Sequence, residues 1–174
     1  MAFIEIRHQA LSDELTRLAN QVAHAGQALA PIGEDIVERT KQRFASATGP
    51  DGSRWQPNTR ATLMNYIQSR GGFSRKTGQI LSKGRALAIS KRPLQGQNGD
   101  LARQLFSDAT DEELTFGSTM RYAAMQQFGG TKAQFPQLWG NIPARQFLPI
   151  NAAGELYPAE ADLIVEQLRQ YLQG

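Results

Sequence analysis

The chain has 174 residues, no cysteine and a formal net charge of +3, from 19 Lys and Arg residues against 16 Asp and Glu residues. This length suits one domain, 1–174, which at this size buries roughly 70% of the surface of its unfolded chain. The lack of cysteine excludes disulfides and thiolate metal sites, and it is compatible with a reducing compartment.

The opening residues, MAFIEIRHQALSDE, contain acidic side chains and no long apolar core, so no signal peptide is expected. No stretch approaches 18 consecutive apolar residues, and no membrane span is predicted.

Residues 3–8 alternate apolar and charged side chains, which predicts a half-buried strand. Ser12 is the expected N-cap of a following helix, and Pro31 is expected to interrupt or kink that helix. One narrow stripe runs along it, formed by Leu11, Leu15, Leu18, Val22, Ala25 and Leu29.

A second amphipathic segment has Ile32, Ile36, Val37, Thr40 and Phe44 on one face. Two explanations of the first stripe stay open at this point. It packs into the core of its own chain, or it lies against a neighbouring subunit.

Turn-forming residues 49–57 surround Trp55, and residues 58–69 predict a short helix. Residues 70–98 are interrupted by glycines and rich in bases, with residues 86–90 a possible strand. We therefore predict that residues 70–98 form a long, flexible basic loop.

Residues 102–118 predict a β-hairpin, in which Leu105 and Phe106 end one arm and Leu114 and Phe116 begin the other. A short helix around Tyr122–Phe128 then stops at a Gly-Gly pair, and Pro158 opens a C-terminal helix. The predicted class is α+β, with N-terminal and C-terminal amphipathic helices packed on a small antiparallel sheet.

Nothing in the sequence predicts chemistry. His8 and His24 lack partners at metal-ligand spacing, and the acidic run at 108–113 lacks the turn glycine of a calcium loop. The Ser and Thr residues near lysines lack the spacing of catalytic or phosphate-binding motifs. We predict no catalytic, cofactor or metal site, and no enzyme.

Charge is unevenly distributed along the chain. Between Asp51 and Asp100 there is no acidic residue and there are nine basic ones. This region predicts a preference for anionic partners, and aromatic residues within it would allow stacking on bases. The residues expected to contact DNA or a protein partner are Arg70, Arg75, Lys76, Lys83, Arg85, Lys91 and Arg92.

Three segments, taken together, resemble the virion morphogenesis or tail completion proteins of Mu-like and related tailed bacteriophages. They are DGSRWQP (51–57), LTFGSTMRYAAMQQFGG (114–130) and IPARQFLPI (142–150). Gln126 stands where that family usually has His, and Gln146 replaces the second Pro of its Pro-Ala-Arg-Pro signature.

The resemblance implies a structural protein of the virion, at the neck where a DNA-filled head joins a tail. It implies a tail completion or tail terminator-like subunit in a homo-oligomeric ring, expected to be a hexamer. The implied partners are adjacent neck, connector or tail-tube proteins, with possible contact to packaged DNA. The alternative is a non-specific nucleic-acid-binding accessory protein that acts through the basic residues of 54–92.

Two roles stay open for the conspicuous residues of these motifs. In the first, they form an intrachain latch in which Tyr122, Phe128, Ile142, Phe147 and Leu148 fill the core and Arg145 bonds to carbonyls or a carboxylate. In the second, residues 135–139 and Arg145 pack into a neighbouring subunit. The residues assigned to interface or latch are Trp55, Tyr122, Phe128, Trp139, Arg145 and Phe147.

Overall fold

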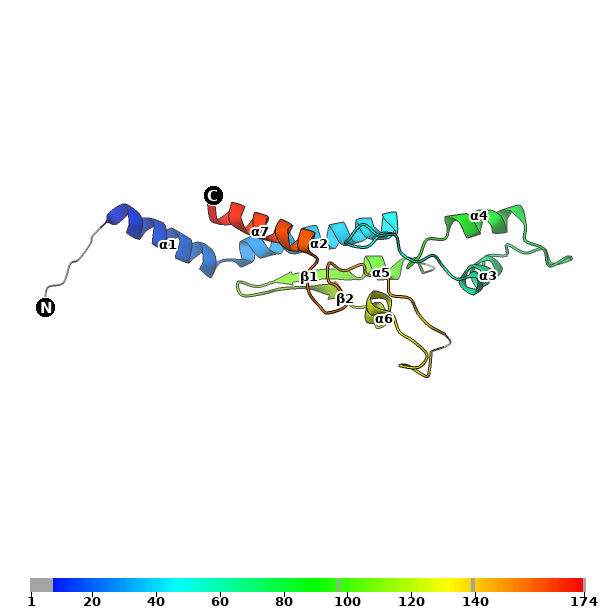
Figure 1. The fold of residues 1–174 in the computed structure, drawn as a ribbon. Helices are drawn as coiled ribbons and strands as arrows, with labels where there is room; N and C mark the ends of the chain where they lie inside the picture. The colour runs from blue at the N-terminus through cyan, green and yellow to red at the C-terminus, as the bar shows by residue number, and fades with distance from the viewer. Residues whose placement is uncertain (1–7, 97, 139, 174) are drawn as a thin grey trace.

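The structure is a computed structural model that describes residues 8–96, 98–138 and 140–173. The chain is elongated, with helix α1 (Gln9–Ala23) at one end and helices α3 (Arg60–Ser69) and α4 (Ser82–Ser90) at the other (Figure 1). Helix α2 (Gly26–Ser46) runs through the middle and contacts both the β-hairpin and helix α7 (Pro158–Gln173). The class is α+β, as predicted.

Helix α2 buries the stripe that its sequence predicts. Ile32, Ile36, Thr40 and Phe44 are all buried, at the spacing of one helical face. The C-cap residue after the helix is Ala47, which adopts a left-handed conformation with φ 56°. This buried face is the surface on which the rest of the domain is assembled.

The N-terminal helix differs from the prediction at both ends. Its N-cap is His8, whose Nδ1 accepts the Leu11 amide at 3.2 Å, and Ser12 lies inside the helix. The helical region is interrupted at His24 and Ala25, between α1 and α2. Pro31 does not interrupt it and lies exposed within α2. A contact distant in sequence marks this break, because the Asp111 carboxylate accepts the Gly26 amide at 3.0 Å. The predicted strand at 3–8 lies outside the described residues apart from His8.

The predicted hairpin is confirmed, with its first arm shifted toward the turn. Strand β1 (Leu105–Ala109) pairs antiparallel with β2 (Leu114–Ser118), so Leu105 and Phe106 begin the first arm instead of ending it. The hairpin packs on α2, where a Cβ at Gly33 would come within 2.8 Å of the Ser107 Cβ atom. Glycine at position 33 therefore permits the close approach of helix and hairpin.

The prediction of a long loop at 70–98 is wrong, because α4 occupies Ser82–Ser90 and contacts α3. Residues 86–90 are therefore helical and not a strand. A Cβ at Gly84 would lie only 2.4 Å from the Gly72 carbonyl oxygen, so this packing requires a glycine inside the helix. In the sequence these glycines are interpreted as loop signals, which is why the helix is not predicted.

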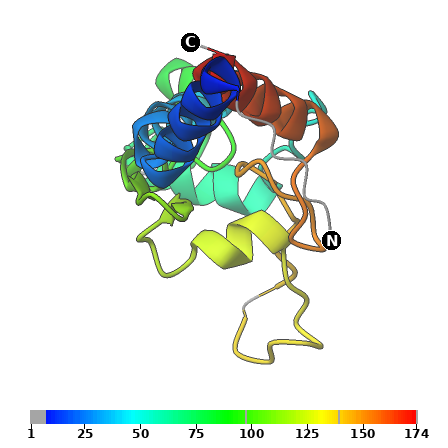
Figure 2. The same ribbon diagram turned by 90° about the vertical axis from the view of Figure 1, so that its left-hand side faces the viewer.

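The last two helices match their predictions closely. Helix α6 (Ala123–Phe128) ends before Gly129, and α7 spans Pro158–Gln173. A short helix α5 (Asp100–Arg103) precedes the hairpin. Viewed along the long axis, α1 and α7 lie on one side of the molecule and the loop after α6 projects from the other (Figure 2). The hydrophobic core near the middle is formed by Phe44, Trp55, Leu101, Ala123 and Phe147.

Candidate functional site

The segment 141–150 is held to the body by its one arginine. Arg145 is 7% exposed, and its Nε donates to the Gln56 carbonyl at 2.9 Å while its Nη2 donates to the Pro57 carbonyl at 3.1 Å. Burial lowers the pKa of the Arg145 guanidinium below its usual value. The planar guanidinium thereby joins two loops that are distant in sequence.

Gln127 is the second anchor of this segment, and our sequence analysis missed it. Its Oε1 accepts the backbone amides of Phe147 at 2.8 Å and Leu148 at 3.0 Å, and its Nε2 donates to the Ile150 carbonyl at 2.9 Å. The side chain is 1% exposed. One buried amide therefore satisfies three backbone groups of an irregular segment, which no helix or sheet would otherwise pair.

Trp55 and Phe147 both pack against Phe44 in the hydrophobic core of the same region. Phe44 lies between them, with ring centroids 5.4 Å from Trp55 and 5.3 Å from Phe147. The Trp55 indole Nε1 donates to the Gln146 carbonyl at 2.9 Å. We call residues 141–150 with Trp55, Gln127 and Arg145 the latch.

A buried group of charges ties the latch to the two long helices. Arg43 donates to the Phe147 carbonyl at 3.0 Å and pairs with Glu160, the acidic residue in the first turn of α7. Arg39 also bonds Glu160, at 3.1 Å. Burial lowers the pKa of the Arg43 guanidinium, and the Glu160 carboxylate opposes that effect. Sequence patterns alone do not reveal this group, because Arg43 and Glu160 are 117 residues apart along the chain.

Two residues predicted to fill the core in the intrachain arrangement are exposed instead. Tyr122 is 42% exposed and Phe128 is 44% exposed, so neither fills the core. The buried face of helix α6 is formed by Ala123 and Gln127 instead. Ile142 and Leu148 are half-buried, and Trp139 lies outside the described residues.

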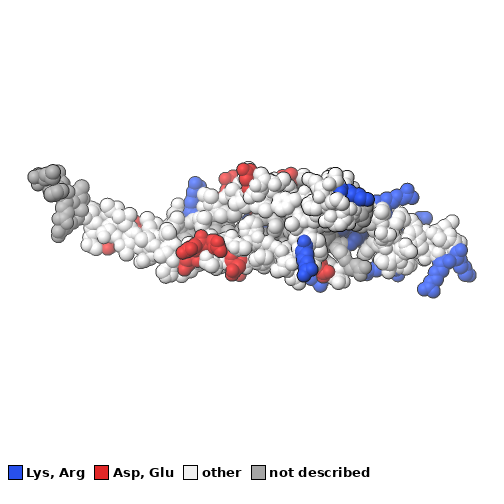
Figure 3. Space-filling view, turned by 90° about the horizontal axis from the view of Figure 1, so that it is seen from below, with Lys and Arg blue, Asp and Glu red and all other residues white. Residues whose placement is uncertain are grey.

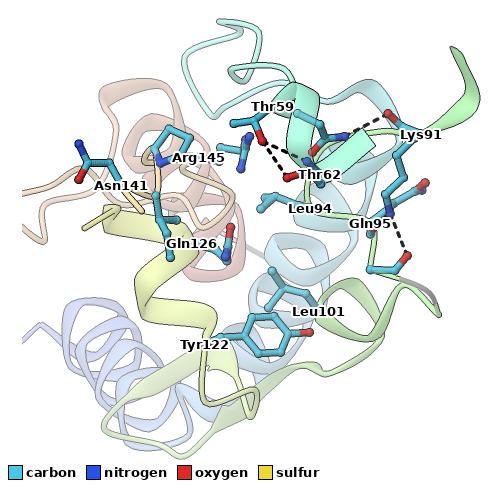
Figure 4. A pocket seen from close by; sticks show the side chains of 14 residues that line it. Thr59, Thr62, Lys91, Leu94, Gln95, Leu101, Tyr122, Gln126, Asn141 and Arg145 are labelled. Carbon is cyan, nitrogen blue, oxygen red and sulfur yellow. Dashed lines mark hydrogen bonds between the residues drawn. The ribbon is translucent and has the colours of Figure 1, made fainter. Parts of the chain in front are cut away.

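A cavity of about 320 Å³ opens beside the latch, between α3, α6 and the loop before α5 (Figure 4). Its polar lining includes Lys91, Tyr122, Gln126 and Arg145, and its lining residues include no carboxylate, histidine or cysteine. Lys91 donates to the Gln95 and Gly96 carbonyls and lies 4.5 Å from the Tyr66 ring centroid.

The described residues form neither a metal-binding cluster nor a membrane-spanning helix. No cluster of three or more His, Cys, Asp or Glu residues there is arranged to hold a metal ion. Among the described helices, none combines the length and apolar character needed to span a membrane.

The latch geometry coincides with the region in which the sequence resembles a phage family. Residues 6–173 match the model of the phage virion morphogenesis family. The chain belongs to this family. It is also similar to the putative capsid assembly protein G of Escherichia phage Mu, with 35% identity over 138 residues that cover 78% of this chain and 76% of the Mu protein. No solved structure matches the chain significantly.

The two glutamines that differ from the expected motif, Gln126 and Gln146, have different surroundings. Gln146 accepts a hydrogen bond from the Tyr157 hydroxyl, so it joins the latch to the segment that enters α7. Gln126 lines the cavity, and its backbone carbonyl accepts the Arg145 amide at 2.8 Å.

Charge is unevenly distributed over the surface. On the face seen in Figure 3, Lys and Arg side chains gather mainly over the α3–α4 end, and most Asp and Glu side chains lie over the half nearer α1. Of the predicted contact residues, Arg75, Lys76, Lys83 and Arg85 are exposed at the basic end. The others have contacts within the chain: Arg70 and Lys91 lie over Tyr66, and Arg92 donates to the Ala45 carbonyl.

Exposed apolar side chains complete the surface. Helix α1 buries no residue, and its Leu11, Leu15 and Val22 are 57%, 58% and 62% exposed. Leu163 and Val165 of α7 are also exposed. The structure therefore leaves open to a partner much of the stripe that the sequence could assign either to the core or to a neighbouring subunit.

Proposed function

We propose that this protein acts in virion assembly as a tail completion or tail terminator-like subunit, at the neck where head joins tail. Its role is structural and non-catalytic, and copies of it form a ring, expected to be a hexamer, against neck, connector or tail-tube proteins. Family membership over residues 6–173 supports a structural assembly role, and the Mu relative is itself described as a putative capsid assembly protein.

The observation that carries the proposal is the contrast between a fastened centre and open ends. The latch uses buried side chains to hold the middle of the domain rigid. The terminal helices meanwhile expose apolar side chains that a monomer in water gains nothing by displaying. This combination is expected of a subunit that functions within an assembly.

An amber mutation in the gene of the parent phage tests this role. We expect lysates that contain DNA-filled heads and separate tails by electron microscopy, and we expect the protein in wild-type particles by mass spectrometry. Complete infectious particles formed without the protein would contradict the proposal.

The second candidate, non-specific DNA binding, is favoured by the exposed bases at the α3–α4 end. Neutralising Arg75, Lys76, Lys83 and Arg85 should then abolish salt-dependent binding to duplex DNA, because each phosphate contact releases counterions. Neutralising Lys41 and Lys132, which are exposed elsewhere, is the matched control. Binding that is unchanged by the four substitutions would exclude this candidate.

A further inference from the structure

Helix α1, at one end of the molecule, has an exposed apolar stripe and is held to α7 only partly along its length. Its apolar stripe is open to solvent, and the hydrogen bonds that fasten α1 to α7 come from its C-terminal half, where Arg17 and Gln21 donate to the Leu172 and Tyr171 carbonyls. An isolated helix of this length is marginal in water, so a partner surface would stabilise it.

The hairpin turn lies at the same end and is acidic. Asp111 joins it to the start of α2 through the Gly26 amide, which places Glu112 and Glu113 beside the junction of α1 and α2. Both glutamates are exposed, and neither forms a salt bridge with another described residue.

The opposite end has the complementary character. Helix α4 exposes 87% of Ile89, the most exposed of the large apolar side chains among the described residues, and Leu81 before it is 43% exposed. Lys83 and Arg85 lie on the same helix, and Arg85 is one helical turn from Ile89. This surface therefore combines an apolar patch with positive charge.

We propose that copies of this chain associate head to tail, with the α1 stripe and hairpin turn of one copy packed against α4 of the next. The proposal rests on the oligomeric role proposed above and adds the two surfaces that meet. A contact between different surfaces at opposite ends is heterologous, and such contacts generate rings when the rotation closes.

A second copy fits these surfaces better than DNA does. Phosphates would pair with Lys83 and Arg85 but would leave Ile89 and Leu81 in water. A second copy supplies carboxylates for the bases and leucines for the apolar patch, because Glu112, Glu113 and the leucines of the α1 stripe are exposed at the opposite end.

Two variants, each damaged at one end, test the contact by light scattering coupled to size-exclusion chromatography. They are Leu11→Asp/Leu15→Asp at the first end and Arg85→Glu/Ile89→Asp at the other. We expect an oligomeric wild type and monomeric variants, with dissociation promoted about tenfold or more for each buried side chain lost.

The decisive measurement is the equimolar mixture of the two variants. Each retains the end that the other lacks, so the mixture should form a heterodimer of twice the 19.2 kDa mass of one chain and stop there. A mixture that stays monomeric overturns the head-to-tail arrangement, as does a variant that keeps the wild-type mass. A wild type that is monomeric at high concentration, or that oligomerises only with DNA, also overturns it.

A charge exchange provides an independent check. Glu112→Lys/Glu113→Lys and Lys83→Glu/Arg85→Glu should each weaken assembly, and all four substitutions in one chain should restore it. The control is Asp162→Lys/Glu166→Lys on α7. Failure of the combined variant to recover contradicts the pairing of these surfaces.

In the competing arrangement, the stripe is covered by other residues of its own chain. If they covered it, Leu11→Asp/Leu15→Asp would lower the melting temperature without changing the mass, and the proposal would fail. An unchanged oligomer in every variant overturns this contact but leaves the head–tail role intact. Conversely, a protein that obeys the mixing rule but is dispensable for particles overturns only the role.

Discussion

At the scale of single residues, the molecule uses polar side chains to fasten irregular backbone. Gln127 and Arg145 are buried and directed at backbone amides and carbonyls of loops that are distant in sequence. These two residues come from the motifs 114–130 and 142–150, and in the described structure both fasten the segment 141–150 to the rest of the domain. Three predictions belong to this scale.

Gln127→Leu should lower the free energy of unfolding by about 2–4 kcal/mol, because two buried amides and one carbonyl lose their partner. Gln126→Leu is the matched control, since the Gln126 contact with Arg145 is made by backbone atoms. Urea denaturation measures both variants, and equal losses would show that Gln127 is not a special anchor.

Glu160→Gln should cost about 3–5 kcal/mol of stability, because it leaves the buried Arg43 without a counter-charge. Glu166→Gln lies on the same helix, where the exposed carboxylate is only 3.9 Å from Arg169, and it should cost less than about 1 kcal/mol. Thermal and urea unfolding of the two variants provide the comparison. Similar losses would contradict the structural role of the buried pair.

Asp51 should contribute a pH-dependent part of the stability. Hydrogen bonds from the Ser53 hydroxyl and amide hold the pKa of its carboxyl below the usual 3.8. A lowered folded-state pKa stabilises the protein above that usual value, and this contribution is lost as the pH falls through the folded pKa. Asp51→Asn should therefore flatten the acid limb of a stability-against-pH curve measured by urea denaturation, and an unchanged acid limb would contradict this role of Asp51.

At the scale of elements, helix ends decide where the latch can lie. Helix α6 stops at Gly129, whose φ of 72° and ψ of −177° belong to a region that only glycine populates readily. The chain then returns alongside residue 142, to which Gly130 pairs in a β-bridge. The glycine thus turns the chain back against the latch.

Gly129→Ala tests this turn. Besides the backbone strain, a Cβ there would lie 2.7 Å from the Ala144 nitrogen, so we expect a loss of about 3 kcal/mol or more. Gly52→Ala is the control, since Gly52 has φ 77° and open space around its Cβ position. It should cost only about 1–2 kcal/mol. Equal losses in urea denaturation would show that the space at Gly129 is unimportant.

At the scale of the whole molecule, stability and exposure are divided between the middle and the ends. The buried aromatic cluster and the latch lie in the middle, whereas α1 contributes no buried residue. On the face seen in Figure 3, basic side chains gather mainly at the α3–α4 end and most acidic ones lie in the half nearer α1. A molecule organised in this way is suited to serial contact with copies of itself.

Deleting residues 1–23 should therefore cost the monomer less stability than Phe147→Ala does. The core substitution removes a side chain with 0% exposure and should cost about 3–5 kcal/mol. Urea unfolding at low protein concentration measures both. A larger loss on deletion would show that α1 belongs to the core of its own chain.

The sequence alone determined the features that arise from local periodicity and from motif order. The α2 stripe, the hairpin, the bounds of α7 and the family were all predictable, because each is written in residues close together along the chain. Only the tertiary structure decided that Gln127 and Glu160 are anchors, that residues 70–98 contain a helix, and that Tyr122 and Phe128 face solvent. These outcomes depend on partners far away in sequence, and a helical pattern shows which residues share a face without showing what covers it.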